Sequence, residues 1–547
     1  MIRPPTRILL WILAALVVAI GIDNLDRPLA NPDEGRYAEI AREMAQSGDW
    51  ITPRLNGLKY FEKPPLQYWA TAASLTLLPH GEYAARLYVA LCGLATLLLV
   101  AFTGRRLGTR ETGLAAAIAL ASSPYFMVMS GVVTLDTGLT LWTTLTFCAY
   151  LLAEREPTRS PTRRRWMLLA WAAMALAVLS KGLVGLVFPA GALLALCVLR
   201  RDLRPVARLE WAYGLVIFLA ISAPWFVAVS YQNPEFPRFF FVHEHWERFL
   251  SASHRRTEPW WYFLPIVAVG FLPWLFALPS AFAHGWRLAG DPRATNEMRL
   301  ALAWAFVVVA FFSISSSKLP AYILPAFPPL ALVIGRYLVH APTRKLAWQV
   351  LPMTLVAMAL VALALQIESR AREPWTRELY GHAQPLALMA ALALLAACAI
   401  AAAALWRGRR WTALVAIAIG MGVVLDRIED AYEALSPRQS GKSVATLMAA
   451  HASPEARLYS VRYFEHSVPF YLRRTLTLVA YVDEFERGIA SEPTAHIPTL
   501  EAFHEDWLRP GEALAIMNPA TFAALGARGL PMQRLHEDPR RVLVRKP

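Results

Sequence analysis

The chain alternates long apolar runs with short polar connections. Helices are expected in the runs, because a backbone amide inside a bilayer must be hydrogen-bonded within its own segment. Thirteen runs approach the twenty or so residues that an α-helix needs to cross a bilayer. They lie near residues 8–24, 84–104, 113–130, 134–152, 166–181, 183–199, 211–230, 262–283, 299–316, 320–338, 347–365, 385–405 and 411–428. The pattern predicts a polytopic α-helical membrane protein.

Basic residues alternate between the connections and predict the topology. Every second connection is short and basic: Arg3/Arg7, Arg105/Arg106/Arg110, Arg155 to Arg165, Arg200 to Arg208, Arg287/Arg293, Arg344/Lys345 and Arg407/Arg409/Arg410. The long connections 25–83 and 231–261 mix acids with bases. Because cytoplasmic loops are enriched in Lys and Arg, we expect a cytoplasmic N-terminus. The odd number of spans then places the tail on the opposite side. The tight hairpins at Ser130–Thr134 and Lys181–Leu183 are the weakest points of this topology. If one of the spans they join does not cross, the orientation of every later segment is inverted.

The composition fits this class. Of the 547 residues, 56% are hydrophobic and 17% are charged, whereas soluble domains are closer to a quarter charged. The net charge of +14 could suggest nucleic acid, but the Arg residues lie between apolar runs, so we expect no nucleic-acid partner. The apolar N-terminal segment resembles a signal peptide without a convincing cleavage site, and we predict an uncleaved first span. The four cysteines lie in apolar stretches, which does not support a disulfide framework or a zinc knuckle.

The pattern changes after the last apolar run. Short β-branched and aromatic runs, such as RLYSVRYF and RRVLVRK, alternate with possible helices such as SGKSVATLMAAHA. This alternation predicts a small α/β domain. We therefore divide the chain into a membrane region, 1–428, and a soluble domain, 429–547. The tail contains no phosphate-binding glycine loop, and we expect it to serve as a cap or scaffold.

The first long connection carries two polar blocks. The first is NPDEGRYAEIAREM, residues 31–44, which predicts a helix capped by Asn31 or Asp33, with a dipole that favours anions at its start. The alternative reading is a plain helix cap followed by a solvated amphipathic helix. The second block is YFEKPPLQYW, residues 60–69, where Lys63 lies near an acid and suits a lipid-linked phosphate. The apolar stretch 68–78 is too short to cross, and we expect an interfacial helix on the outer leaflet with Tyr68 and Trp69 at headgroup level.

Two further positions are candidates for chemistry. Asp136 begins the fourth predicted span, where a carboxylate suggests function, although pairing with an Arg such as Arg86 is the plainer explanation. The connection 231–261 contains FVHEHWERF. It is either a polar interfacial turn or the source of a ligand, His243, that joins Glu62 on a divalent metal such as zinc.

With SKLPAYILPAFPPLAL, residues 317–332, the two blocks closely resemble the polymyxin-resistance aminoarabinose transferases of Gram-negative bacteria. That family belongs to the GT-C superfamily, which includes the protein O-mannosyltransferases. The resemblance extends to about residue 340 and thins over the tail. It implies a GT-C fold and transfer of 4-amino-4-deoxy-L-arabinose from undecaprenyl phosphate to a lipid A phosphate. The reaction would occur on the periplasmic leaflet of the inner membrane.

The resemblance also implies roles for individual residues. The acid of the first outer loop of GT-C enzymes falls on Asp33, with Glu34 beside it. The Tyr-x-Glu-Lys of the family falls on Tyr60, Glu62 and Lys63. We expect the following roles: Asp33, Glu34 and Asp136 in catalysis; Arg36, Tyr37, Tyr60, Lys63, Lys318 and Tyr322 in substrate binding; and Glu62 with His243 as possible metal ligands.

Two kinds of alternative to this function remain, a related transferase and a transporter. A related transferase would use another polyprenyl-linked sugar or a protein hydroxyl as acceptor. A transporter of lipid-linked sugars would carry charges near the bilayer midplane and internal repeats. The chain shows no clear repeat, and its acids gather at one predicted face, which favours an enzyme.

Overall fold

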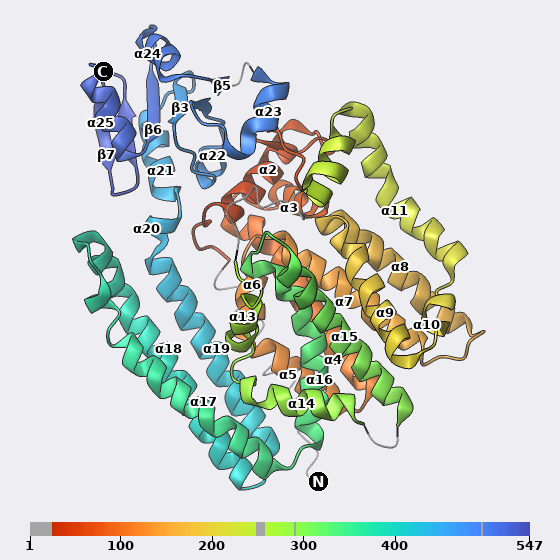
Figure 1. Cartoon of the computed structure of the whole chain (residues 1–547). Helices are drawn as coiled ribbons and strands as arrows, with labels where there is room; N and C mark the ends of the chain where they lie inside the picture. Colours follow the sequence, from red (N-terminus) through yellow and green to blue (C-terminus); the bar gives the residue numbers. More distant parts are fainter. Residues whose placement is uncertain (1–24, 248–257, 289–290, 494–495) are drawn as a thin grey trace. The chain divides into compact units, whose positions relative to one another are not determined.

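The computed structural model describes residues 25–247, 258–288, 291–493 and 496–547, which form two compact units (Figure 1). Of the described residues, one unit comprises Leu25 and Tyr88–Ala434, and the other comprises Asp26–Leu87 and Leu435–Pro547. The first predicted span, 8–24, lies outside the described residues. The first long connection therefore belongs to the same unit as the tail, which the division at residue 428 did not anticipate.

The first unit is helical. Its elements are α4 (Glu82–Leu107, which begins in the other unit), α5 (Arg110–Ala121), α6 (Pro124–Ser130), α7 (Leu135–Ala153), α8 (Pro161–Lys181), α9 (Val184–Arg200), α10 (Arg204–Ala207), α11 (Trp211–Gln232), η1 (Arg238–Glu247), α13 (Phe263–Gly270), η2 (Leu275–Ala277), α14 (Leu278–Trp286), α15 (Pro292–Ile314), η3 (Pro320–Ala326), α16 (Phe327–His340), α17 (Thr343–Ala364), η4 (Glu368–Arg370), α18 (Pro374–Trp406) and α19 (Arg410–Ala434). All twelve predicted spans within the described residues fall on helices, which confirms a polytopic helical fold.

Fewer helices meet the length and hydropathy expected of a membrane span than there are apolar runs in the sequence. Among the described residues, seven helices are long and apolar enough to cross a membrane, or nine if each of two bent pairs is one span. The bent pairs are α5 with α6, at 72°, and α13 with the segment Leu275–Trp286, at 108°. Helix α9 is shorter, at 17 residues. The count of thirteen stays a prediction.

Four of the predicted basic regions meet at one end of the helical unit. Arg155 donates to the backbone oxygens of Arg106 and Leu107 and pairs with Glu297 at 2.6 Å. Arg163 donates to the oxygen of Arg208 and pairs with Glu154. Backbone oxygens at helix C-termini lack partners within their helices, and the guanidinium groups supply them with donors. The gathering of these connections agrees with the alternation in the sequence.

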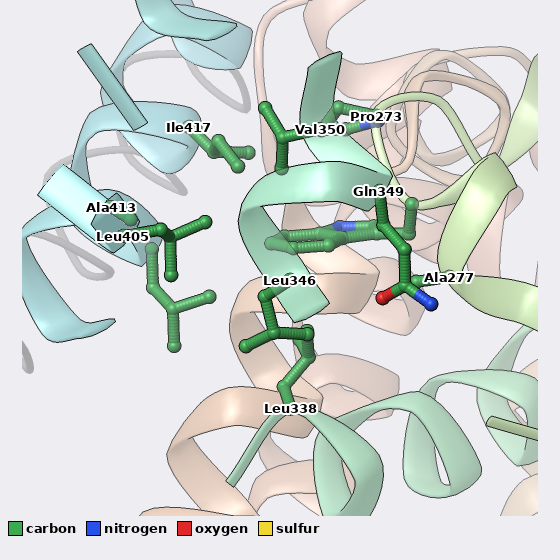
Figure 2. Close-up of a pocket in the computed structure, with 11 residues that line it drawn as sticks. Pro273, Ala277, Leu338, Leu346, Gln349, Val350, Leu405, Ala413 and Ile417 are labelled. Carbon is green, nitrogen blue, oxygen red and sulfur yellow. The ribbon is translucent and has the colours of Figure 1, made fainter. Parts of the chain in front are cut away.

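A narrow gap remains where helices α16 to α19 meet (Figure 2). Its volume is about 10 Å³, the lower limit for one water molecule. The amide of Gln349 lines the gap, but it donates to Ser280 at 2.9 Å and accepts from Tyr337 at 3.0 Å. The indole nitrogen of Trp274, which also lines the gap, donates to Ser122 at 2.7 Å. The rest of the wall is apolar: Pro273, Ala277, Leu338, Leu346, Val350, Leu405, Ala413, Leu414 and Ile417. The gap is a packing defect and offers no polar group to a ligand.

The second unit contains a six-stranded mixed sheet. Its order is β5-β4-β3-β6-β8-β7, in which β5, β4, β3 and β6 run parallel and β8 runs antiparallel to both of its neighbours, β6 and β7. The strands are β3 (Arg457–Val461), β4 (Thr477–Val479), β5 (His496–Ile497), β6 (Ala513–Met517), β7 (Gln533–Glu537) and β8 (Val542–Arg545). The connecting helices are α20 (Ser436–Gln439), α21 (Lys442–His451), α22 (Ser467–Leu472), η5 (Asp483–Phe485), α23 (Glu486–Ser491), α24 (Leu500–Leu508) and α25 (Pro519–Ala527). This confirms the predicted α/β domain.

The first long connection folds onto the tail within this unit. It forms α2 (Asp33–Ser47), the hairpin β1 (Arg54–Leu55) and β2 (Leu58–Lys59), and α3 (Leu66–Leu77). A Cβ on Gly35 would lie 2.5 Å from the backbone nitrogen of Ser467, so α2 and α22 touch backbone to backbone. The amide of Asn56 exchanges two hydrogen bonds with the backbone of Leu476, at 2.7 and 2.8 Å. Such backbone-directed contacts leave no mark in a hydrophobic pattern.

The expected helix cap is wrong. The position before α2 is Pro32, and no side chain caps the helix. Asn31 instead accepts from the backbone of Ser467 at 2.8 Å and donates to that of Gln439 at 3.0 Å. Its side chain ties the start of α2 to the tail.

Candidate active site

Asp33 lies at the first position of α2, where the helix dipole favours a negative charge. Its Oδ1 accepts from Nη1 of Arg36, one turn later, at 2.8 Å. The Asp33 side chain is 40% exposed, whereas that of Arg36 is 11% exposed. A carboxylate is thus presented to solvent by a guanidinium that is itself held in the protein.

The tail supplies the other side of Arg36. Nε of Arg36 pairs with Oε2 of Glu484, in η5, at 2.8 Å, and the other oxygen of Glu484 pairs with Nε2 of His466. Burial alone would raise the pKa of Glu484, but the hydrogen bond and charge of His466, together with Arg36, lower it. Asp33, Arg36, Glu484 and His466 therefore form one chain of charge-assisted contacts. Sequence reasoning missed the two tail residues. The polar FEHS segment after β3 was a sign of His466, and the acidic VDEF segment after β4 was a sign of Glu484.

Three tyrosines are buried in the same unit. Tyr37, Tyr60 and Tyr68 are 9%, 3% and 0% exposed, and the rings of Tyr37 and Tyr68 lie 6.1 Å apart. Burial raises the pKa of each phenol, and the charge of Glu62 adds to the rise. All three stay protonated near neutral pH and can donate hydrogen bonds. The side chain of Tyr68 is turned into the protein by α3, and its expected depth at headgroup level stays a prediction.

Glu62 and Lys63 precede α3, in the loop that ends at the two prolines. Both are half-buried, and Nζ of Lys63 donates to the backbone oxygen of Glu62 at 2.9 Å. Pro65 then occupies the N-cap position of α3. The ammonium group of Lys63 carries a positive charge that can attract an anion.

Glu34 is engaged in a buried ion pair. Its two oxygens each accept from Arg86 at 2.9 Å, and Arg27 lies 3.7 Å away. Burial by itself would raise the pKa of Glu34, but Arg86 and Arg27 outweigh it and lower the pKa to about 2. The expected pairing of Asp136 with Arg86 is therefore wrong. These contacts hold the start of α2 to the start of α4, and the catalytic role expected of Glu34 stays a prediction.

The remaining predicted residues lie in the helical unit. Asp136, at the start of α7, pairs with Lys181 at the end of α8. Nζ of Lys181 lies 4.3 Å from the ring centroid of Tyr322, a cation–π distance. Lys318 is 6% exposed and donates to the backbone oxygen of Ser315 at 2.6 Å. Lys181 joins two predicted residues, and its only sign in the sequence was a charge ending an apolar run.

The expected metal site stays a prediction. Glu62 belongs to one unit and His243 to the other, where the imidazole stacks on Phe239 at 5.5 Å. The side chains of Glu244, His245 and Glu247 lie outside the described part of the chain. Within that part, no group of three or more His, Cys, Asp and Glu residues is placed to hold a metal ion.

Two family models match the sequence. The dolichyl-phosphate-mannose-protein mannosyltransferase model matches residues 26–289, and the aminoarabinose transferase C-terminal domain model matches residues 444–546. The tail, where the resemblance was expected to thin, thus matches a domain of the aminoarabinose transferases.

Curated relatives and solved structures agree with these matches. An undecaprenyl phosphate-alpha-4-amino-4-deoxy-L-arabinose arabinosyl transferase of Pseudomonas paraeruginosa is 34% identical over 73% of this chain and 72% of its own length. The chain belongs to this arabinosyl transferase family. Against members from Pseudomonas fluorescens and Edwardsiella ictaluri, 35% and 38% identical, the match covers 69% and 57% of this chain and spans 64% and 56% of their lengths.

The structural likeness to the arabinosyl transferase family extends over almost the whole chain. The crystal structure of ArnT from Cupriavidus metallidurans bound to undecaprenyl phosphate has a TM-score of 0.93 and 36% identity, and it covers 99% of this chain and 98% of that one. The archaeal oligosaccharyltransferase AglB from Archaeoglobus fulgidus has a TM-score of 0.53 and 13% identity. The likeness covers 93% of this chain and 69% of that one. The second likeness shows a shared fold. The chain is therefore a multi-pass membrane protein with the GT-C fold.

Proposed function

We propose that the chain transfers 4-amino-4-deoxy-L-arabinose from undecaprenyl phosphate to a phosphate of lipid A. The observation that carries the proposal is the likeness of 99% of the chain, at 36% identity, to an ArnT bound to undecaprenyl phosphate. The curated relatives bear names that describe the same donor. Modification of lipid A with this sugar lowers its negative charge, so the activity would confer resistance to polymyxin and other cationic peptides.

The chemistry requires no proton transfer. An oxygen of the ionised lipid A phosphate attacks the anomeric carbon of the sugar, and the bond from that carbon to the undecaprenyl phosphate oxygen breaks. The acceptor phosphate loses one negative charge, and the departing phosphate gains one. The acceptor is already a nucleophile near neutral pH, so a general base is unnecessary. The enzyme must instead place both lipids and compensate the charge that develops on the leaving group.

The residues of the second unit suit these tasks. Asp33 presents its carboxylate to solvent and would hold the 4-amino group of the sugar or the positive charge that develops at the anomeric carbon. Lys63 would hold the departing phosphate, together with Arg36. The three buried tyrosines would donate to sugar or phosphate oxygens. Asp136, Lys318 and Tyr322 belong to the other unit, and their proposed part in the reaction rests on the family resemblance.

We also propose that the protein resides in the inner membrane of a Gram-negative bacterium, with the active site and the tail in the periplasm. The alternation of basic connections supports this orientation. The gathering of Arg106, Arg155, Arg163 and Arg208 at one end of the helical unit supports it as well.

Mass spectrometry of lipid A tests the function directly. A strain that makes the aminoarabinose donor but lacks this protein should yield lipid A without the sugar, and supplying the gene should restore the mass of one aminopentose on a phosphate. Purified protein with undecaprenyl phosphate–aminoarabinose and lipid A should give the same product. Transfer to a protein hydroxyl, or no transfer while the donor is consumed elsewhere, would contradict the proposal.

A further inference from the structure

Three helices of the first unit surround an open cavity at the end that carries the basic connections. The C-terminal ends of α7 and α9 and the N-terminal end of α15 line it, and its volume is about 270 Å³. Two carboxylates, two guanidinium groups and one phenol face it from Glu154, Glu297, Arg200, Arg293 and Tyr150. The proposed sugar transfer uses none of these residues.

The two carboxylates of the cavity are already neutralised by residues outside its lining. Glu297 receives two hydrogen bonds from Arg155, at 2.6 and 2.8 Å. Glu154 pairs with the buried Arg163 at 3.2 Å. Because each acid has its own partner, neither needs the lining arginines.

The lining arginines are left with spare donor capacity. Arg200 is exposed and has only a loose ion pair with Asp202, at 3.6 Å. Arg293 is also exposed and makes no ion pair among the residues that the structure describes. Two guanidinium groups converging on one cavity favour a ligand with several anionic oxygens, such as a phosphate.

The phenol of Tyr150 is a second, independent sign of a ligand. Tyr150 is 4% exposed, and its hydroxyl lacks a hydrogen-bond partner in the described part of the chain. A buried hydroxyl without a partner costs stability, and a ligand that brings an acceptor oxygen into the cavity removes this cost. The hydroxyl can donate to an acceptor in the cavity.

Apolar surface continues from the cavity along α9. Leu196 and Leu300 line the cavity, and Leu199, which lies within about 60° of Leu196 around α9, is 40% exposed. On a helix of a membrane protein, large exposed apolar side chains of this kind face lipid acyl chains. The site therefore suits a molecule with a phosphate at one end and acyl chains beside it.

We propose that this cavity binds the headgroup phosphate of an anionic phospholipid whose acyl chains lie along α9. Arg200, Arg293 and Tyr150 hold the phosphate oxygens. Basic pockets between membrane helices at the cytoplasmic side commonly hold such headgroups, and the apolar wall distinguishes a lipid from a free anion. The proposal does not rest on the transferase activity.

Lipid binding can be measured on the purified full-length protein. Native mass spectrometry in detergent, with phosphatidylglycerol added in steps, should show saturable retention of this lipid. Phosphatidylcholine should be retained at least several-fold less, since its headgroup is neutral overall. In the double variant Arg200→Gln/Arg293→Gln, affinity for phosphatidylglycerol should fall about tenfold or more, because each Arg contributes about a factor of five near a membrane surface.

Arg407→Gln/Arg409→Gln is the matched control. It removes the same charge from the connection before α19, where both side chains are exposed and do not line the cavity. Its affinity for phosphatidylglycerol should stay within about twofold of the unaltered protein. An equal loss in both double variants would show a general effect of charge and would overturn the proposed site.

Tyr150→Phe separates lipid binding from folding. It removes a buried hydroxyl that has no partner, so thermal stability in lipid-free detergent should not fall, while lipid affinity should drop about threefold. Unchanged affinity in both Tyr150→Phe and the arginine variant would overturn the proposal. Inorganic phosphate or undecaprenyl phosphate that competes with phosphatidylglycerol at equal concentration would also overturn it, in favour of a general anion site or a carrier-lipid site.

Discussion

Glu484, in the C-terminal tail, pairs with Nε of Arg36 at 2.8 Å, while Nη1 of the same arginine donates to Asp33 at 2.8 Å. Because Glu484 occupies one edge of the guanidinium, Asp33 receives a single hydrogen bond from it. A fork–fork pair, in which both carboxylate oxygens are used, would engage Asp33 more fully. We infer that the tail positions the proposed catalytic carboxylate, which is more than the cap or scaffold expected from the sequence.

Glu484→Gln should therefore slow transfer without unfolding the protein. The amide still accepts a hydrogen bond but lacks the charge that holds Arg36, so Arg36 should shift toward Asp33. We expect kcat to fall about tenfold, equivalent to roughly 1.4 kcal/mol, and Glu484→Asp to recover part of the rate. Transfer from undecaprenyl phosphate–aminoarabinose by purified protein measures both.

Glu501→Gln is the control for that experiment. Glu501 is a tail acid whose pair with Arg528 is exposed on both sides, and such pairs contribute little. A Glu484→Gln enzyme with normal kcat, or a Glu501→Gln enzyme that is equally slow, would remove Glu484 from the site.

Asp33→Asn should abolish transfer while the amount of protein in the membrane stays near normal. The Asp33 side chain is 40% exposed, it makes an ion pair with Arg36, and it does not cap α2. Loss of a pair this exposed costs about 1 kcal/mol or less. Immunoblots of membranes and mass spectra of lipid A test the two halves of the prediction. Normal lipid A modification by a well-expressed variant would refute the assignment of Asp33.

Glu34→Gln should act on stability, with a defined pH dependence. The pKa of Glu34 is lowered from 4.5 to about 2 in the folded protein. Its ionised form therefore adds stability above about pH 4.5, and this contribution is lost as pH falls toward 2. The shift corresponds to about 3 kcal/mol.

The unfolding temperature in detergent tests the role of Glu34. The variant should be less stable than the unaltered protein at pH 7, and the difference should shrink steadily between pH 4.5 and 2. All other carboxylates are common to both proteins, so the difference isolates Glu34. If the difference in unfolding temperature stays constant over this range, the stabilisation by Glu34 does not depend on its charge.

Lys63→Ala should strongly weaken use of the donor lipid, and Lys63→Arg should be tolerated only in part. A compact ammonium can approach a phosphate where a planar guanidinium does not fit equally well. The rate of transfer as a function of donor concentration should show a raised KM for the donor.

The control for Lys63 is Arg473→Gln, because Arg473 is exposed. We expect Arg473 and Arg474 from the sequence to be surface charges, but Arg474 is not a suitable control, since it donates to the backbone oxygens of Ser453 and Ala456 at 3.0 and 2.7 Å. Full polymyxin resistance in Lys63→Ala, with loss of resistance in Arg473→Gln, would place the donor site in the tail.

Reporter fusions test the topology. Fusions after Arg165 and Arg208 should report the cytoplasm, and fusions at residue 60 and in the tail should report the periplasm. The bent pairs α5–α6 and α13–α14 make this test informative, because a re-entrant pair would not cross the membrane. A cytoplasmic tail would remove one of the thirteen predicted spans.

Much of the candidate site was predictable, because its blocks are local. The acids and bases of residues 31–44 and 60–69 lie close together in the sequence, and α2 and α3 form where the pattern places helices. The roles within each block were harder to predict. Neighbouring acids receive opposite environments, since Asp33 faces solvent and Glu34 is buried against Arg86.

The sequence by itself determined the helical membrane region, the α/β tail and the blocks that carry the charges, because hydrophobic periodicity and local charge are properties of neighbouring residues. Only the tertiary structure decided which charges pair. Arg86 binds Glu34 and leaves Asp136 to Lys181, and Glu484 reaches Arg36 from the tail. A buried charge takes whichever opposite charge the packed backbone brings within a few ångströms, and that choice depends on contacts between segments that no sequence spacing records.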